Sequence, residues 1–101
     1  MQTFGLNYHV KPEHVEDFKA ALVQLIDEMK TYDGHVETKL FADVMQPNSM
    51  MIYSEWKTKA EFASYFRSEG FQQAIKETVG MLESHPTHMA GQDIRLIKNP
   101  G

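Results

Sequence analysis

Residues 50–71 read MMIYSEWKTKAEFASYFRSEGF and contain a strand, a helix start and a helix in direct succession. The run around Tyr53 is rich in residues that favour strands, and it ends on Trp56. Thr58 is followed three residues later by Glu61, the capping-box spacing in which a hydroxyl and a carboxylate satisfy free amides of a helix start. The stretch therefore predicts a corner at which a strand leads into a helix.

The helix that begins after Thr58 is expected to carry an aromatic face. Phe62, Tyr65 and Phe66 recur at spacings of three and four residues, which places them on one side of a helix. Gly70 is expected to let the chain stop and restart. A further helix is indicated by the positions Phe71, Ala74, Ile75, Thr78 and Leu82. On local grounds alone, this region is a structural corner.

The N-terminal part predicts a strand followed by a long amphipathic helix. Apolar and polar residues alternate over residues 3–10, as in a strand with two different faces. Pro12 stands where a first-turn proline is tolerated, and a turn at Asp33-Gly34 is expected to end the helix. The apolar stripe of this helix consists of Val15, Phe18, Leu22, Ile26 and Met29.

The remaining strands complete a β-α-β-β-α-β order. Residues 36–45 alternate, a turn follows, and residues 50–57 return as a strand. A last short strand is expected at residues 93–98. This order predicts one α+β domain over residues 1–101 with a ferredoxin-like arrangement. Its helices would cover one sheet face, so a second copy is expected to bury the other face in a homodimer.

Composition limits the classes of function. The chain has 101 residues, 42% hydrophobic and 24% charged, which is typical of a globular protein. A net charge of −4 without a basic cluster argues against nucleic acid as a partner. The absence of cysteine excludes a thiol nucleophile and a thiolate metal site. The first residues lack the features of a signal peptide, so a cytoplasmic location away from the membrane is expected.

In order and spacing, these motifs resemble the antibiotic biosynthesis monooxygenase family of dimeric α+β barrels. The shared features are the strand leading to Lys11-Pro12, the amphipathic helix, the Asp33-Gly34 turn and the strand end Tyr53-x-Glu55-Trp56. The resemblance implies a ferredoxin-like protomer that pairs into a barrel dimer, with a ligand cavity between each sheet and its own helices. Members include oxygenases that act on phenols and quinols without metal or flavin, and haem-degrading monooxygenases.

The family's functional positions match this chain unevenly. Haem-degrading members carry a first-strand asparagine that matches Asn7, while their helix tryptophan falls on Tyr65 and their iron-ligating histidine on Ile75. Isoleucine cannot ligate iron, so haem chemistry here would need another axial ligand. In the phenol-oxidising branch the strand tryptophan matches Trp56, and Ile52 replaces an asparagine upstream of it.

Polar residues on the first strand supply the leading candidates for catalysis. Asn7 and His9 share a strand face and lie roughly 7 Å apart by strand rise. If that face lines the sheet–helix cavity, Asn7 could orient an oxygen while His9 moves a proton, because a histidine titrates near neutral pH. Tyr65 is a candidate hydrogen-bond donor. The alternative is a purely structural role, in which His9 packs in the protein or lies at a dimer interface and Tyr65 is a core aromatic residue. The candidate substrate-binding residues are Trp56, Phe62 and Tyr53.

No metal site is expected, because Pro86 disrupts the geometry of the short His85-x-x-His88 spacing and no third ligand is evident. The resemblance favours a cofactor-independent monooxygenase in which an aromatic, quinol or enol substrate itself supplies electrons to O₂. Two alternatives stay open: a haem-binding or haem-degrading protein, and a non-catalytic dimer that binds a small planar ligand.

Overall fold

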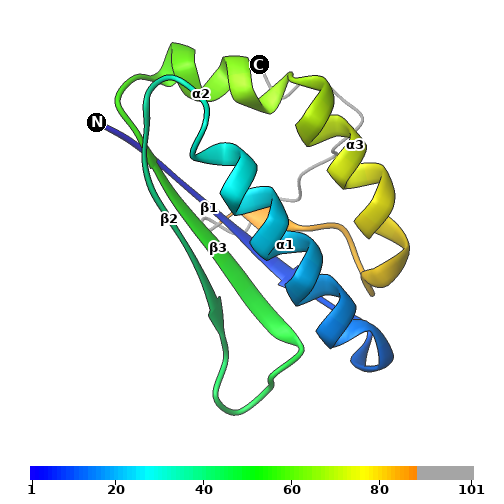
Figure 1. Cartoon of the computed structure of the whole chain (residues 1–101). Helices are drawn as coiled ribbons and strands as arrows, with labels where there is room; N and C mark the ends of the chain where they lie inside the picture. Colours follow the sequence, from blue (N-terminus) through cyan, green and yellow to red (C-terminus); the bar gives the residue numbers. More distant parts are fainter. Residues whose placement is uncertain (89–101) are drawn as a thin grey trace.

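A four-stranded antiparallel sheet forms one layer of the molecule, and the helices lie together on one of its faces (Figure 1). The computed structural model describes residues 1–88. Within the sheet the strands follow the order β2-β3-β1-β4. They are β1 (Gln2–His9), β2 (His35–Ala42), β3 (Ser49–Trp56) and β4 (Thr87–His88).

The helices complete the predicted β-α-β-β-α-β order, and the ferredoxin-like α+β fold is confirmed. They are α1 (Val15–Met29), α2 (Lys59–Phe66) and α3 (Glu69–Thr78), with the short 3₁₀ helices η1 (Pro12–His14) and η2 (Val79–Met81). Within residues 1–88, no helix has the length and apolar character that crossing a membrane requires. The strand predicted at residues 93–98 lies outside the described residues, and the fourth described strand is β4, beside β1.

Pairing between β1 and β3 fixes the two faces of the sheet. The two strands pair over eight residues each, from Gln2 opposite Trp56 to His9 opposite Ser49. Because successive side chains point to opposite faces, Tyr8 lies on the helix side and His9 on the other. The exposed fractions agree, since Tyr8 is 8% exposed whereas His9 is an exposed residue.

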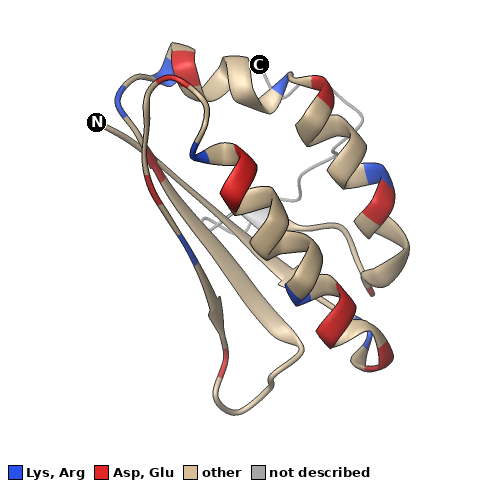
Figure 2. Cartoon of the chain, in the orientation of Figure 1, with Lys and Arg blue, Asp and Glu red and all other residues tan. Residues whose placement is uncertain are grey.

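No described helix covers the second face of the sheet, which we call the open face. In register across it lie Asn7, Met51 and Phe41, and the Phe41 side chain is 47% exposed. Charged residues of the open face come from β2 and β3, since β1 contains none (Figure 2). That a second copy covers this face stays a prediction.

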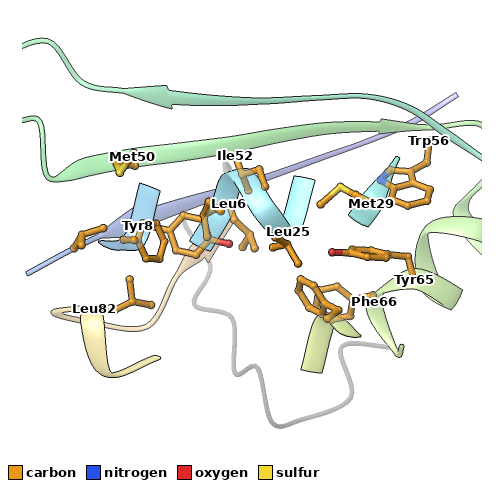
Figure 3. Packing of buried hydrophobic residues seen from close by; sticks show 14 residues of the cluster. Leu6, Tyr8, Leu25, Met29, Met50, Ile52, Trp56, Tyr65, Phe66 and Leu82 are labelled. Atoms are coloured by element: carbon orange, nitrogen blue, oxygen red, sulfur yellow. The ribbon is translucent and has the colours of Figure 1, made fainter. Parts of the chain in front are cut away.

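The core lies between the helix face of the sheet and α1, α2 and α3 (Figure 3). Trp56 and Phe18 are the largest side chains that are fully buried. Burying one large apolar side chain contributes about 1.5–3 kcal/mol, so this layer holds the helices on the sheet. The buried stripe of α1 consists of Phe18, Leu22, Leu25 and Met29, close to the predicted one.

The strand-to-helix corner forms where the capping signal placed it. Thr58 precedes α2, and its Oγ1 accepts a hydrogen bond of 3.1 Å from the backbone N–H of Glu61. The Glu61 carboxylate in turn accepts from the Thr58 hydroxyl at 3.0 Å rather than from a backbone amide. In a complete capping box the glutamate side chain accepts from the backbone N–H of the cap residue; here it accepts from the side chain of that residue instead.

The break between α2 and α3 differs from the prediction. It falls at Arg67 and Ser68, and the Ser68 hydroxyl oxygen accepts from the backbone N–H of Phe71 at 3.2 Å. Gly70 lies inside the first turn of α3, so its assignment as the break was wrong. A serine cap, rather than a glycine, separates the helices. The left-handed backbone that requires glycine occurs at Gly34, with φ of 87°.

Candidate functional site

A groove of about 230 Å³ lies between α1 and α3. Its buried lining includes Tyr8 of β1, Leu25 of α1 and Phe71 of α3. Its more exposed lining is polar and comes from both helices: Gln24, Glu28, Gln73, Glu77 and Thr78. The groove therefore combines an apolar floor with a rim of amides and carboxylates.

Behind the groove, a smaller inner cavity of about 20 Å³ lies between the helices and the sheet. Tyr8, Leu25 and Phe71 line both spaces, so these three side chains separate the groove from the inner cavity. A volume of roughly 10–15 Å³ holds one water molecule, so the inner cavity holds a very small molecule but no aromatic ring. Its other lining residues are Phe4, Leu6, Met29, Ile52, Ser54, Trp56, Phe62, Tyr65 and Phe66.

The hydroxyl of Tyr65 is buried in this cavity without a hydrogen-bond partner among the described residues. The side chain comes from α2, and its hydroxyl points toward Leu25 (Figure 3). Leaving such a group unsatisfied costs about 1–3 kcal/mol. This hydroxyl is therefore available to a guest molecule that carries an acceptor oxygen.

Burial also decides what the two cavity tyrosines can do chemically. It raises the pKa of the Tyr65 phenol well above its ordinary value, and Tyr8, Tyr32 and Glu28 raise it further. Burial likewise raises the pKa of the Tyr8 phenol. Both phenols stay protonated at neutral pH, so they can donate hydrogen bonds but cannot act as bases.

Trp56 is held in place by a chain of hydrogen bonds. Its indole N–H donates to Ser54 Oγ at 2.7 Å. Ser54 Oγ lies 2.8 Å from Thr38 Oγ1, which lies 2.7 Å from Nε2 of His35. The Trp56 ring stacks on Tyr65, with centroids 5.3 Å apart and an interplanar angle of 25°. The chain therefore orients the ring against which Tyr65 packs.

Three of the predicted site residues come together in the inner cavity, namely Tyr65, Trp56 and Phe62. The ring centroid of Phe62 lies 5.9 Å from that of Trp56. These side chains reach the cavity from the end of β3 and from α2, the two sides of the corner that the sequence predicts. They form an aromatic surface beside the free hydroxyl.

The other three predicted residues do not lie in this cavity. Asn7 and His9 alternate with the buried Leu6 and Tyr8, so they lie on the open face. Tyr53 also lies there, and its hydroxyl donates to Glu55 at 3.3 Å. The condition for a shared cavity of Asn7, His9 and Tyr65 is therefore not met, because the first two lie on the face expected to form the dimer interface. Tyr53 lies outside the inner cavity as well. The catalytic and binding roles of these residues stay predictions.

Tyr8 and Glu28 line the candidate site, and the sequence did not point to either of them. Tyr8 was visible as a polar-tipped residue on the apolar face of the first strand, alternating with Leu6. Glu28 follows Leu25 by three residues, a spacing that places both on the same side of a helix. The pairing of α1 with α3 was the missing information, since it makes that side of α1 one wall of the groove.

The described lining of the groove and the inner cavity offers haem iron no histidine ligand. Ile75, on which the iron-ligating histidine of haem-degrading family members falls by the resemblance, lines the groove. The carboxylates of Glu28 and Glu77 at the rim would oppose the carboxylates of haem. Among the described residues there is also no cluster of three or more His, Cys, Asp or Glu that could hold a metal ion.

Comparison with known proteins gives two kinds of relatives. A protein from Natronomonas pharaonis, named as a proposed heme-binding protein, is 32% identical over 87 residues that cover 86% of this chain. A second of that name, from Haloarcula marismortui, is 33% identical over 87 residues and 86% of this chain. The matches cover 14% and 13% of those proteins, so this chain spans about a seventh of their length.

Solved structures share the fold over nearly the whole chain. A proposed antibiotic biosynthesis monooxygenase from Nitrosomonas europaea superposes with a TM-score of 0.82 at 14% identity, covering 86% of this chain and 84% of that one. Another, from Deinococcus radiodurans, has a TM-score of 0.80 at 20% identity and covers 97% and 100%. The family model described as antibiotic biosynthesis monooxygenase matches residues 1–77. The chain therefore belongs to the antibiotic biosynthesis monooxygenase family.

Proposed function

We propose that this protein is a cofactor-independent monooxygenase that oxidises a small phenol, quinol or enol between its sheet and its helices. The observation that carries the proposal is the buried hydroxyl of Tyr65, which has no described partner and lies in an aromatic cavity next to a larger groove. Membership of the family supports the reaction class.

The substrate ring lies in the groove, since the inner cavity is too small for it. Its oxygen approaches Tyr65 when the side chains of Leu25 or Phe71, which separate the two spaces, rotate. The inner cavity is then the place for O₂, a small apolar molecule. Aromatic and aliphatic side chains around it exclude water, which strengthens every hydrogen bond made inside.

Tyr65 and Glu28 divide the proton chemistry between them. Glu28 lines the groove in which the substrate ring lies, so its carboxylate is placed to accept the substrate's hydroxyl proton. Tyr65 remains protonated and donates its hydrogen bond to the resulting oxyanion. Stabilising that oxyanion favours electron transfer from the substrate to O₂.

The reaction balances without an outside reductant. A phenol or hydroquinone with a free ring C–H bond ortho or para to a hydroxyl group is oxygenated at that carbon and, in net, loses two hydrogens as it becomes a quinone. One atom of O₂ forms the new C–O bond, and the other leaves as water with the two hydrogens. All electrons for the reduction of O₂ thus come from the substrate.

The proposed active unit is a homodimer joined through the open faces of two sheets. Phe41 is exposed on that face, Met51 is partly exposed there, and no described helix covers it. Sedimentation at micromolar concentration is expected to show a dimer. A well-folded monomer under the same conditions would contradict this part of the proposal.

Oxygen consumption with a panel of hydroquinones tests the reaction. Tyr65→Phe is expected to lower kcat by roughly 10²-fold, the usual effect of removing one donor to an oxyanion. Tyr53→Phe removes the same hydroxyl from the open face, so it is the matched control and should retain wild-type turnover. Wild-type turnover in Tyr65→Phe would contradict the role of this hydroxyl.

A second candidate function is a binding protein without catalysis. It is favoured by one observation, namely that the ionisable groups of the inner cavity are tyrosines whose pKa is raised, which leaves no base inside it. Stoichiometric binding of hydroquinones with no consumption of oxygen would support this function over the monooxygenase.

A further inference from the structure

We infer that the groove between α1 and α3 selects its guest by charge, accepting uncharged or cationic aromatic molecules and rejecting anionic ones. The inference rests on the proposed function, because it names the substrate class of the same site. It concerns binding alone, so it can be tested apart from the reaction.

Carboxylates stand on both walls of the groove, and among residues 1–88 no lysine or arginine lines it. Glu28 comes from α1 and Glu77 from α3. Figure 2 shows acidic positions on both helices. Lys76 is next to Glu77 in sequence, but it lines a different surface hollow of α3 together with Arg67. A guest in the groove therefore lies between two negative charges.

Neither carboxylate forms a salt bridge with another residue of the part of the chain that the structure describes. The ion pairs among residues 1–88 join Lys19 to Glu16, Lys30 to Asp27 and Lys39 to Glu37. Glu77 does accept a hydrogen bond from the side-chain amide of Gln73 at 3.4 Å, but an amide carries no net charge. Both carboxylates remain able to repel an anion and attract a cation.

A second observation points to an uncharged acceptor on the guest itself. The groove leads inward to the buried Tyr65 hydroxyl, which offers one hydrogen bond and no positive charge. A guest that carries an added anionic substituent would have to bury that charge, besides its phenol oxygen, without a cationic partner, and burying a charge without pairing it is costly. A neutral phenol oxygen would be satisfied by the same hydroxyl.

The size of the effect follows from Coulomb's law. The interaction energy of two unit charges about 4 Å apart in water is about 1 kcal/mol, which corresponds to about a fivefold change in affinity. Two carboxylates and the partly dry groove raise the expected preference to at least about tenfold at low salt. The preference should shrink in about 1 M salt, where the screening length is about 3 Å.

Three matched hydroquinones test the inference by calorimetry without oxygen. They are methylhydroquinone, which is neutral, aminomethylhydroquinone, which is a cation, and 2,5-dihydroxybenzoate, which is an anion. The neutral and cationic compounds are expected to bind at least about tenfold more tightly than the anion at about 0.01 M salt. Equal affinity for the anion, or no binding of any compound, would overturn the inference.

Variants identify the carboxylates responsible. Glu28→Gln and Glu77→Gln keep the shape of the side chain. Each is expected to lower severalfold the ratio between the affinity for the neutral compound and that for the anion. Glu13→Gln, in η1 and outside the groove, makes the same change in net charge and should leave the preference unchanged. A preference that survives both groove substitutions would overturn the assignment, as would an equal effect of Glu13→Gln.

The outcomes separate this inference from the proposed function. Tight binding of the neutral compound without oxygen consumption would contradict the reaction and leave the charge preference standing. Oxygen consumption with equal binding of all three compounds would contradict the charge preference and leave the reaction standing.

Discussion

The two faces of the sheet are made from alternate residues of the same strands, and they differ in almost every physical property. On the helix face, Tyr8 is buried and lines both the groove and the inner cavity. Its neighbour His9 is exposed on the open face. One step along a strand thus decides whether a side chain can reach the sheet–helix site. Chemical suitability alone is a poor guide to function here.

The largest contrast is expected between two adjacent methionines of β3. Met50 is 3% exposed on the helix face, whereas Met51 is only partly buried on the open face. Met50→Ala should lower the free energy of unfolding by about 2–5 kcal/mol, because it leaves a cavity in the core. Met51→Ala should cost less than about 1 kcal/mol in the protomer.

Urea denaturation at several protein concentrations measures both effects. A dimer built on the open face would make the Met51→Ala loss depend on concentration, since association stabilises the folded state. If the two variants lost the same free energy of unfolding in dilute protein, the predicted difference between the two faces would be contradicted.

Two serines of β3 extend the comparison to polar groups. Ser54 accepts the indole N–H of Trp56 on the helix face, while Ser49 lies on the opposite face. Ser54→Ala leaves the buried N–H without its acceptor and should cost about 1–3 kcal/mol. Ser49→Ala should change stability by less than about 0.5 kcal/mol. Thermal unfolding of both variants checks this. If Ser54→Ala left the free energy of unfolding unchanged, the hydrogen bond from Trp56 to Ser54 would not stabilise the protein.

Removing the unpartnered hydroxyl should stabilise the protein while it impairs function. Tyr65→Phe deletes a buried group that lacks a described partner, so the free energy of unfolding is expected to rise by about 1 kcal/mol. Tyr53→Phe, on the open face, should stay within about 0.5 kcal/mol of wild type. Chemical denaturation gives both values. A clear loss of stability in Tyr65→Phe would mean that the hydroxyl is already satisfied.

The smallest effect is a pH dependence that arises at the edge of the helix face. Burial lowers the pKa of His35, and Lys30 lowers it further. The folded state therefore favours the neutral imidazole, and the unfolded chain binds the proton more readily. Stability from this group is fully present above about pH 6.5 and is lost as the pH falls toward the lower folded value.

The urea midpoint of wild type is thus expected to fall between about pH 7.5 and pH 5 by more than that of His35→Gln. Identical slopes in the two proteins would show that His35 does not contribute. The variant also tests whether the chain of hydrogen bonds that runs from His35 to the indole of Trp56 depends on this imidazole.

The sequence predicted the framework of the molecule well because its signals were local. The stripe of α1 and the Thr58–Glu61 start of α2 depend on spacing within one helix, and both appear in the structure. The break before α3 was misplaced, since Gly70 suggested a stop that the Ser68 cap provides instead.

The site was harder to predict because it depends on which sheet face meets the helices. Alternation correctly grouped Asn7 with His9 and Leu6 with Tyr8. In a chain expected to pair through its sheet, however, both faces can be buried, so grouping alone does not identify the cavity side. Glu28 could not be assigned to a site until α1 and α3 were seen side by side.

The most direct test of the account is a crystal structure of the protein with methylhydroquinone, grown without oxygen. The ring is expected in the groove between α1 and α3, with one of its oxygens within hydrogen-bonding distance of the Tyr65 hydroxyl. A ring bound on the open face beside Asn7 and His9, with the groove empty, would contradict it.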